Sequence, residues 1–143
     1  MIIKLEKIPI KSKKDVEAIN VTPIVEDVVE KSGVTNGIVF IFTTHTSSGL
    51  IVTEGLPCLE ADILNHLEKL VPEDGDYRHM RYLDIDGRIA FNADTHIKSL
   101  LGGINTFFPI ENKKIVKGSR QTIYFLEFDG PLERTFCIQV MGE

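Results

Sequence analysis

The sequence predicts an α+β fold, a largely antiparallel or mixed β-sheet sandwich with two main helices and one short helix. Two observations predict it. Strand-like segments outnumber helical ones, and the strands do not alternate regularly with helices. The chain has 143 residues, of which 43% are hydrophobic and 26% charged, as in one ordinary globular domain. We therefore expect residues 1–143 to form a single domain.

The first quarter of the chain predicts an edge strand and a helix. Residues 2–10 alternate β-branched residues with lysines, as an edge strand does when charge protects its solvent side. Thr22 is the expected N-cap and Pro23 the first residue of a helix over 23–32, which Gly33 ends.

The next segments predict a buried strand and the longest helix. From Gly37 the run IVFIFT is continuously apolar, which indicates a strand inside a sheet and covered on both faces. LIVT follows as another short strand. Pro57 then begins a helix with one apolar stripe, formed by Leu59, Ile63, Leu67 and Leu70. Residues 71–88 have no periodicity, and a loop of that length predicts a functional role.

The last third is expected to be mostly sheet. Asp94 is the expected cap of a short helix, THIKSLL, that Gly102 and Gly103 close. TFFPI and KIV flank the turn 111–113 and predict one hairpin. QTIYFLEF and TFCIQVM flank the turn 129–131 and predict a second hairpin.

Charge and composition restrict the partners. With 16 basic and 21 acidic residues the net charge is -5, which argues against a nucleic-acid partner. Cys58 and Cys137 lack metal-ligand spacing and lie in apolar stretches, as in proteins of reducing compartments. The charged N-terminal segment does not resemble a signal peptide, and no run reaches membrane-spanning length. We expect a cytoplasmic protein that does not interact with membranes.

Three of the four histidines follow strand ends or open a helix, and they suggest a metal site. His45 begins the turn HTSSG, His79 lies in the long loop, and His96 follows Asn-Ala-Asp-Thr. Three imidazoles can bind one zinc and leave a fourth position for water or substrate. The alternative is that the histidines only form hydrogen bonds or lie at the surface.

Several polar groups suggest a site for a small anion. The turn 46–49 offers hydroxyls and backbone N–H groups, while Lys98 and Arg134 offer positive charge, although ordinary surface solvation explains the same pattern. Glu127 lies in a hydrophobic strand, where a buried carboxylate needs a cation such as Arg134. A structural salt bridge between them is at least as good an interpretation as catalysis.

A set of motifs then makes the pattern specific. In order, the sequence contains HTSSGLIVTE, Asp62, LVPED with YRH, NADTHIK with Gly102, and KGSRQTIYFLE followed by DGP and Arg134. Together they resemble the YjbQ family over about three quarters of the chain, from residue 37 onward. Two positions depart from the family pattern, because Ser48 stands where alanine is frequent and Arg120 where tryptophan is usual.

The resemblance implies a homotrimer and a set of site residues. The implied catalytic residues are His45, Glu54 and Asp94, and the implied metal ligands are His45, His79 and His96. The implied substrate-binding residues are Thr46, Ser47, Asn92, Lys98, Gly118, Gln121 and Arg134.

The resemblance also implies an activity, since the family is described as secondary thiamine-phosphate synthase enzymes. We expect a weak transferase of that type acting on small phosphorylated metabolites, with a divalent metal as cofactor. The metal would be zinc, or Mg²⁺ if diphosphate transfer is the reaction. Three alternatives remain open: a metal-dependent hydrolase of a small anionic substrate, a non-catalytic module that binds a metabolite or metal, and a purely structural role for the histidines.

Overall fold

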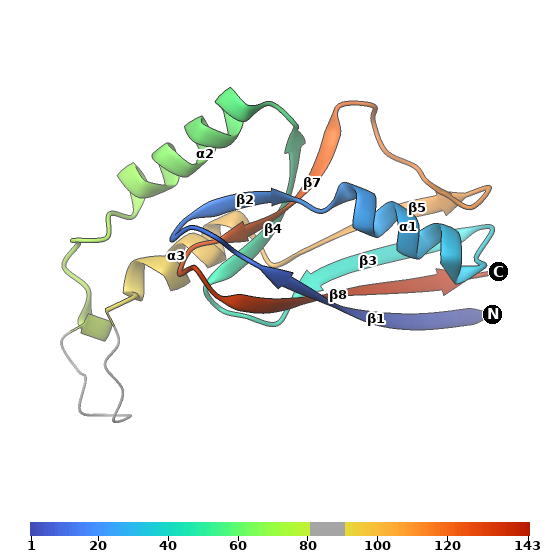
Figure 1. The fold of residues 1–143 in the computed structure, drawn as a ribbon, viewed down its shortest axis with the longest axis horizontal. Helices are drawn as coiled ribbons and strands as arrows, with labels where there is room; N and C mark the ends of the chain where they lie inside the picture. Colours follow the sequence, from blue (N-terminus) through green and yellow to red (C-terminus); the bar gives the residue numbers. More distant parts are fainter. Residues whose placement is uncertain (81–90) are drawn as a thin grey trace.

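Two antiparallel sheets form the fold, as a computed structural model shows for residues 1–80 and 91–143 (Figure 1). The larger sheet has the order β1 (Ile2–Lys11), β8 (Glu133–Gly142), β3 (Gly37–Thr43), β5 (Asn105–Glu111) and β6 (Lys114–Ile115). The smaller sheet has the order β2 (Glu17–Asn20), β7 (Gln121–Glu127) and β4 (Ser48–Glu54). The predicted α+β class, the edge strand β1 and the β5–β6 hairpin are confirmed.

In the described part of the chain, three α-helices and one 3₁₀ turn accompany the sheets. They are α1 (Thr22–Ser32), α2 (Pro57–Leu70), the 3₁₀ turn η1 (Arg78–Met80) and α3 (Ala93–Gly102). Part of the loop predicted over 71–88 lies outside the described residues. No helix within residues 1–80 and 91–143 has the length and apolar character needed to cross a membrane.

The main core lies between the inner face of the larger sheet and a layer made of α1 and the smaller sheet. Val25 and Val29 of α1, Ile41 of β3, Phe125 of β7 and Phe136 of β8 are almost completely buried in it. A second cluster packs α2 on the other face of the smaller sheet, through Leu64 and Leu67. The smaller sheet is therefore covered on both faces.

The predicted hairpin between β7 and β8 is wrong. Both strands exist, but β7 pairs with β2 and β4, whereas β8 pairs with β1 and β3. The turn 129–131 thus connects the two sheets. Local sequence marks a turn between two strands and does not show which strand each one will pair with.

The prediction for β3 is half right. The strand lies inside its sheet, between β8 and β5, but only one of its faces is buried. Val39 and Ile41 are completely buried on the inner face, while Phe40 on the outer face is 38% exposed. The continuous apolar run in β3 therefore combines core residues on the inner face with apolar residues that remain exposed on the outer face.

Both predicted helix caps are displaced. At α1 the N-cap is Val21, and the hydroxyl of Thr22 instead accepts a hydrogen bond from the N–H of Ile123. At α3 the N-cap is Asn92, so Asp94 lies in the first turn and makes an ion pair rather than a cap.

Candidate functional site

The loop after β3 holds three predicted site residues, His45, Thr46 and Ser47, and it is fixed from several directions. The carbonyl oxygens of residues 46, 47 and 48 all accept hydrogen bonds. Their donors are, in that order, Nδ1 of His96 at 2.9 Å, the backbone N–H of Phe128 at 3.2 Å and the hydroxyl of Ser99 at 2.5 Å. The loop is thereby attached both to α3 and to the chain that leaves β7.

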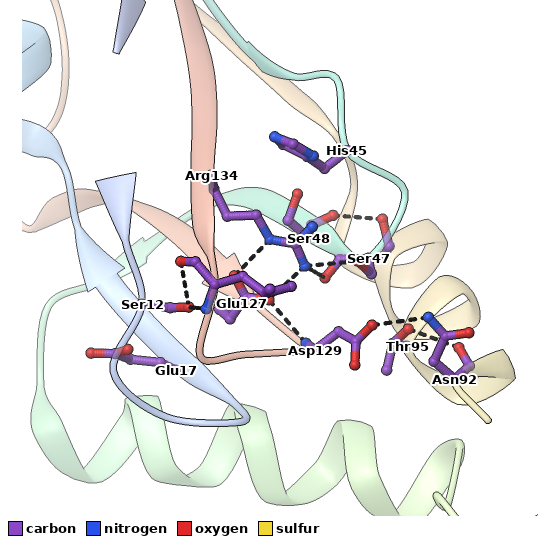
Figure 2. Close-up of polar contacts among 12 residues, drawn as sticks. Ser12, Glu17, His45, Ser47, Ser48, Asn92, Thr95, Glu127, Asp129 and Arg134 are labelled. Atoms are coloured by element: carbon purple, nitrogen blue, oxygen red, sulfur yellow. Dashed lines mark hydrogen bonds and ion pairs between the residues drawn. The ribbon is translucent and has the colours of Figure 1, made fainter. Parts of the chain in front are cut away.

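A buried ion pair lies beneath this loop (Figure 2). Arg134 donates from Nε and Nη2 to the two carboxylate oxygens of Glu127, at 2.8 and 2.6 Å, and also from Nη2 to the hydroxyl of Ser47 at 2.8 Å. The hydrogen bond to Glu127 raises the pKa of Arg134. The predicted salt bridge is confirmed. It joins the end of β7 in the smaller sheet to the start of β8 in the larger sheet.

His45 is directed to the backbone of β8. Its Nε2 accepts a hydrogen bond from the N–H of Thr135 at 3.1 Å, which requires an unprotonated Nε2. Burial, and then the positive charge of Arg134, lower the pKa of His45. The imidazole is therefore held neutral, with its Nε2 lone pair already used.

His96 and His79 meet on the other side of the loop. Their rings are in edge-to-face contact with centroids 5.5 Å apart. Because the carbonyl of Thr46 can only accept, Nδ1 of His96 carries a proton, and in the neutral imidazole the lone pair is then on Nε2. Both rings line an open cleft of about 340 Å³, here called the histidine cleft. Its lining residues are Tyr77, Arg78, His79, Ala93, His96 and Ile97.

Lys98 follows His96 by two residues on α3 and is 3% exposed. Its ammonium group contacts two carboxylates, that of Asp94 at 2.8 Å and that of Glu68 on α2. Burial acts to lower the pKa of Lys98, but the hydrogen bonds to Asp94 and Glu68 outweigh it and raise the pKa. In this arrangement the charge of Lys98 is neutralised by the protein itself.

Two buried acceptors at the start of α3 have no hydrogen-bond partner among the described residues. They are Oδ1 of Asn92 and Oδ1 of Asp94. The amide of Asn92 also donates to Asp129 at 2.9 Å, so its orientation is fixed (Figure 2). Buried polar atoms without a partner are uncommon, and these two can accept hydrogen bonds from a ligand or water.

The remaining predicted residues lie at the opposite end of β4. Glu54 ends this strand beside Gln121, and Gly118 donates its N–H to the side chain of Gln121 at 2.7 Å. Glu54 pairs with Arg120 at 3.1 Å, over an open hollow of about 490 Å³. Seven strand residues span roughly 20 Å, so within one chain this group does not meet the histidine cleft.

The three predicted metal ligands do not gather around one point. His79 and His96 lie together, whereas the Nε2 lone pair of His45 is committed to Thr135. No group of three His, Cys, Asp or Glu side chains in the described part of the chain has the arrangement of a metal site. The hydrogen bond from Nδ1 of His96 to a backbone carbonyl is of the kind that orients histidine ligands in metal sites.

Sequence reasoning assigned no role to four residues of this region, Glu68, Tyr77, Arg78 and Asp129, although the last three lie in the motifs YRH and DGP. Glu68 lies 30 residues before Lys98 and on another helix, so no spacing rule connects the two. Tyr77 and Arg78 lie in the loop that was expected to be functional, which was the available signal.

The fold and this site define a small α+β protein with a histidine-lined cleft at the end opposite the chain termini (Figure 1). The chain belongs to the YjbQ-like family UPF0047, whose family model matches residues 6–143. Among curated relatives, a UPF0047 protein of Archaeoglobus fulgidus is 38% identical and spans 94% of this chain and 99% of its own length. YugU of Bacillus subtilis is 32% identical over 96% of this chain and 99% of its own length.

Solved structures agree with this assignment. A protein of unknown function from Sulfolobus solfataricus superimposes with a TM-score of 0.91 at 30% identity, over 99% of this chain and 98% of that one. A YjbQ/UPF0047 protein from Clostridium acetobutylicum gives a TM-score of 0.86 at 34% identity, over 95% of this chain and 99% of that one. The names of these relatives state no activity.

Proposed function

We propose that this protein binds one small phosphorylated or otherwise anionic metabolite in the histidine cleft and hydrolyses it. The observation that carries the proposal is the contact between His79 and His96, in which the bond to Thr46 places the lone pair of a neutral His96 on Nε2. A neutral imidazole with a fixed tautomer is suited to act as a general base on water. Arg78 is one of the residues that line the cleft, and in this proposal its guanidinium turns toward the anionic substrate.

The size of the cleft supports a single small substrate. About 340 Å³ is near the lower end of ligand pockets, which span roughly 300–1,000 Å³. A transfer reaction of the thiamine-phosphate synthase type brings together two phosphorylated substrates, and this cleft is small for both. The volume is therefore compatible with one small substrate per chain.

As an alternative to general-base catalysis by His96, a divalent metal, with zinc as the first candidate, is proposed to bind at His79 and His96. Nε2 of His96 would then be a metal ligand and would not act as the base, because its Nδ1 already donates to Thr46. When bound, such a metal lowers the pKa of a coordinated water and supplies a hydroxide at neutral pH. His45 becomes a third ligand only if its hydrogen bond to Thr135 opens. In the described arrangement His45 supports the loop that presents the Thr46 carbonyl to His96.

We also propose a homotrimer, supported by the outer face of the larger sheet. Leu5, Gln139, Phe40 and Phe107 lie in one row across four strands, and no described helix covers them. Leu5 is 50% exposed and Phe107 59%, and contiguous apolar surface of this kind is typical of protein interfaces. The free cysteines Cys58 and Cys137 support a cytoplasmic location.

Transfer remains the second candidate because of the hollow beside Glu54 and Arg120. In an assembly, a neighbouring chain can bring this hollow next to the histidine cleft and supply room for a second substrate. Gly118 and Gln121, which lie beside it, would then contact that substrate.

Product analysis by ³¹P NMR separates the candidates. Protein supplemented with Zn²⁺ or Mg²⁺ is incubated with phosphate monoesters, and in parallel with the pyrimidine diphosphate and thiazole phosphate together. Release of inorganic phosphate that His96→Ala abolishes supports hydrolysis. Diphosphate release that requires both substrates supports transfer, and line broadening without products indicates a binding module.

A further inference from the structure

The carboxylate of Glu68 connects the two walls of the histidine cleft. One wall is α3, which carries His96, and the other is the segment from Pro72 to η1, which carries His79. Oε2 of Glu68 contacts the ammonium of Lys98 on α3, and Oε1 accepts the backbone N–H of Glu73 at 2.9 Å. Each oxygen is thus bound to a different wall.

This contact differs from an ordinary surface pair. The side chain of Glu68 is 51% exposed, but that of Lys98 is only 3% exposed and belongs to the interior. Bonds from Lys98 and from the Glu73 backbone also lower the pKa of Glu68, so the carboxylate stays ionised. Exposed pairs contribute little because both side chains are mobile, whereas here one end is fixed.

Glu68 is bonded to the segment from Pro72 to η1, and the position of this segment determines the position of His79. The hydroxyl of Tyr77 donates to the carbonyl of Pro72 at 2.7 Å, which closes the turn between α2 and η1. Arg78 and His79 follow directly. Fixing the N–H of Glu73 therefore fixes the base of a short, internally bonded turn, and His79 lies at its end.

We propose that Glu68 is a positioning residue that sets the separation of His79 and His96 by holding both walls of the histidine cleft. The proposal deepens the proposed function, on which it rests for the use of the cleft. It assigns no chemistry to Glu68 itself.

The fold should tolerate removal of this carboxylate. Lys98 keeps its buried pair with Asp94, at 2.8 Å, when Glu68 is absent. Glu68→Ala is therefore expected to fold, with the connection that Glu68 makes between the two walls removed. Glu73→Ala is the matched control, because Glu73 is exposed and contributes only its backbone N–H, which the substitution retains.

The test uses two readouts on the full chain. The first is the NOE between the rings of His79 and His96 in protein with isotope-labelled histidine. The second is Zn²⁺ affinity, measured by competition with a chromophoric chelator. In Glu68→Ala we expect the NOE to disappear and Zn²⁺ affinity to fall by at least about tenfold, as for other supporting residues of metal sites. Glu68→Gln, which keeps the length and one acceptor, should fall between wild type and Glu68→Ala.

The outcomes separate this proposal from the proposed function. An NOE that persists in Glu68→Ala, or that is lost equally in Glu73→Ala, overturns the positioning role. Loss of the NOE only in Glu68→Ala supports it even if wild type binds no Zn²⁺, a result that would count against the metal in the proposed function.

Discussion

The backbone carbonyl of Thr46 accepts a hydrogen bond from Nδ1 of His96 at 2.9 Å, across 50 residues of sequence. This single contact selects the tautomer of the neutral His96 ring, with the proton on Nδ1 and the lone pair on Nε2. The same loop presents His45 to the backbone of Thr135. Two histidines that look equivalent in the sequence therefore have different roles in the structure, one supporting the loop and the other lining the cleft.

The first prediction concerns metal content. His79→Ala and His96→Ala should each lose bound zinc, whereas His45→Ala should keep most of it, because Nε2 of His45 is used by Thr135. Elemental analysis of protein purified without a His tag measures this directly. Equal loss of zinc in all three variants would restore His45 as a ligand, and circular dichroism must show that each variant is folded.

The second prediction compares two arginine–glutamate pairs. Removing Arg134 leaves Glu127, whose side chain is 0% exposed, as an uncompensated buried charge, so Arg134→Ala should cost roughly 3–5 kcal/mol of unfolding free energy. Arg120→Ala breaks the pair with Glu54, in which Arg120 is 82% exposed, and should cost about 0–1 kcal/mol. Urea unfolding at neutral pH measures both, and similar losses would contradict the assignment of Arg134 to the interior.

Much of the fold could be predicted because it depends on local patterns. Alternation identified β1, and Pro23 with Gly33 bounded α1 to within one residue. The pairing of β7 could not be predicted, because its inner and outer faces are both apolar and no periodicity states which sheet it joins. Sheet membership is a property of packing between distant segments.

The site was predictable only in part for the same reason. The motifs named His79, His96, Asp94 and Lys98, which do lie together at one end of the molecule. Glu68 carries no motif and reaches Lys98 from a different helix. A carboxylate on a surface helix has no feature in the sequence that distinguishes it from a solvated one.

The third prediction is a pH dependence of stability that arises from His45. Burial and the charge of Arg134 lower the pKa of His45 in the folded chain below its ordinary value of 6.5. At a pH between the folded and the unfolded pKa, the unfolded chain therefore binds more protons than the folded chain. Stability from His45 is therefore present above about pH 6.5 and is lost as the pH falls toward the folded pKa. His45→Gln keeps an acceptor for the Thr135 N–H but does not titrate.

The measurement is the urea midpoint of wild type and His45→Gln at about pH 8 and about pH 5.5. Wild type should lose more stability on acidification than the variant does. The difference between the two proteins isolates His45, since the other histidines are common to both. An identical pH response would mean that His45 is not held neutral by its surroundings.

The fourth prediction concerns the outer face of the larger sheet. Phe107 pairs with Phe40 across β3 and β5, and its 59% exposure leaves a large ring in water unless another chain covers it. Phe107→Lys places a charge on this face and should convert a trimer, three times the 16.1 kDa chain mass, into smaller species. Leu70→Lys is the control, because Leu70 is 72% exposed at the end of α2 and lies outside this face. Sedimentation equilibrium measures the masses. A wild type that is monomeric, or a Phe107→Lys variant that stays trimeric, would remove this face as the contact, while dissociation of Leu70→Lys would move the contact to α2.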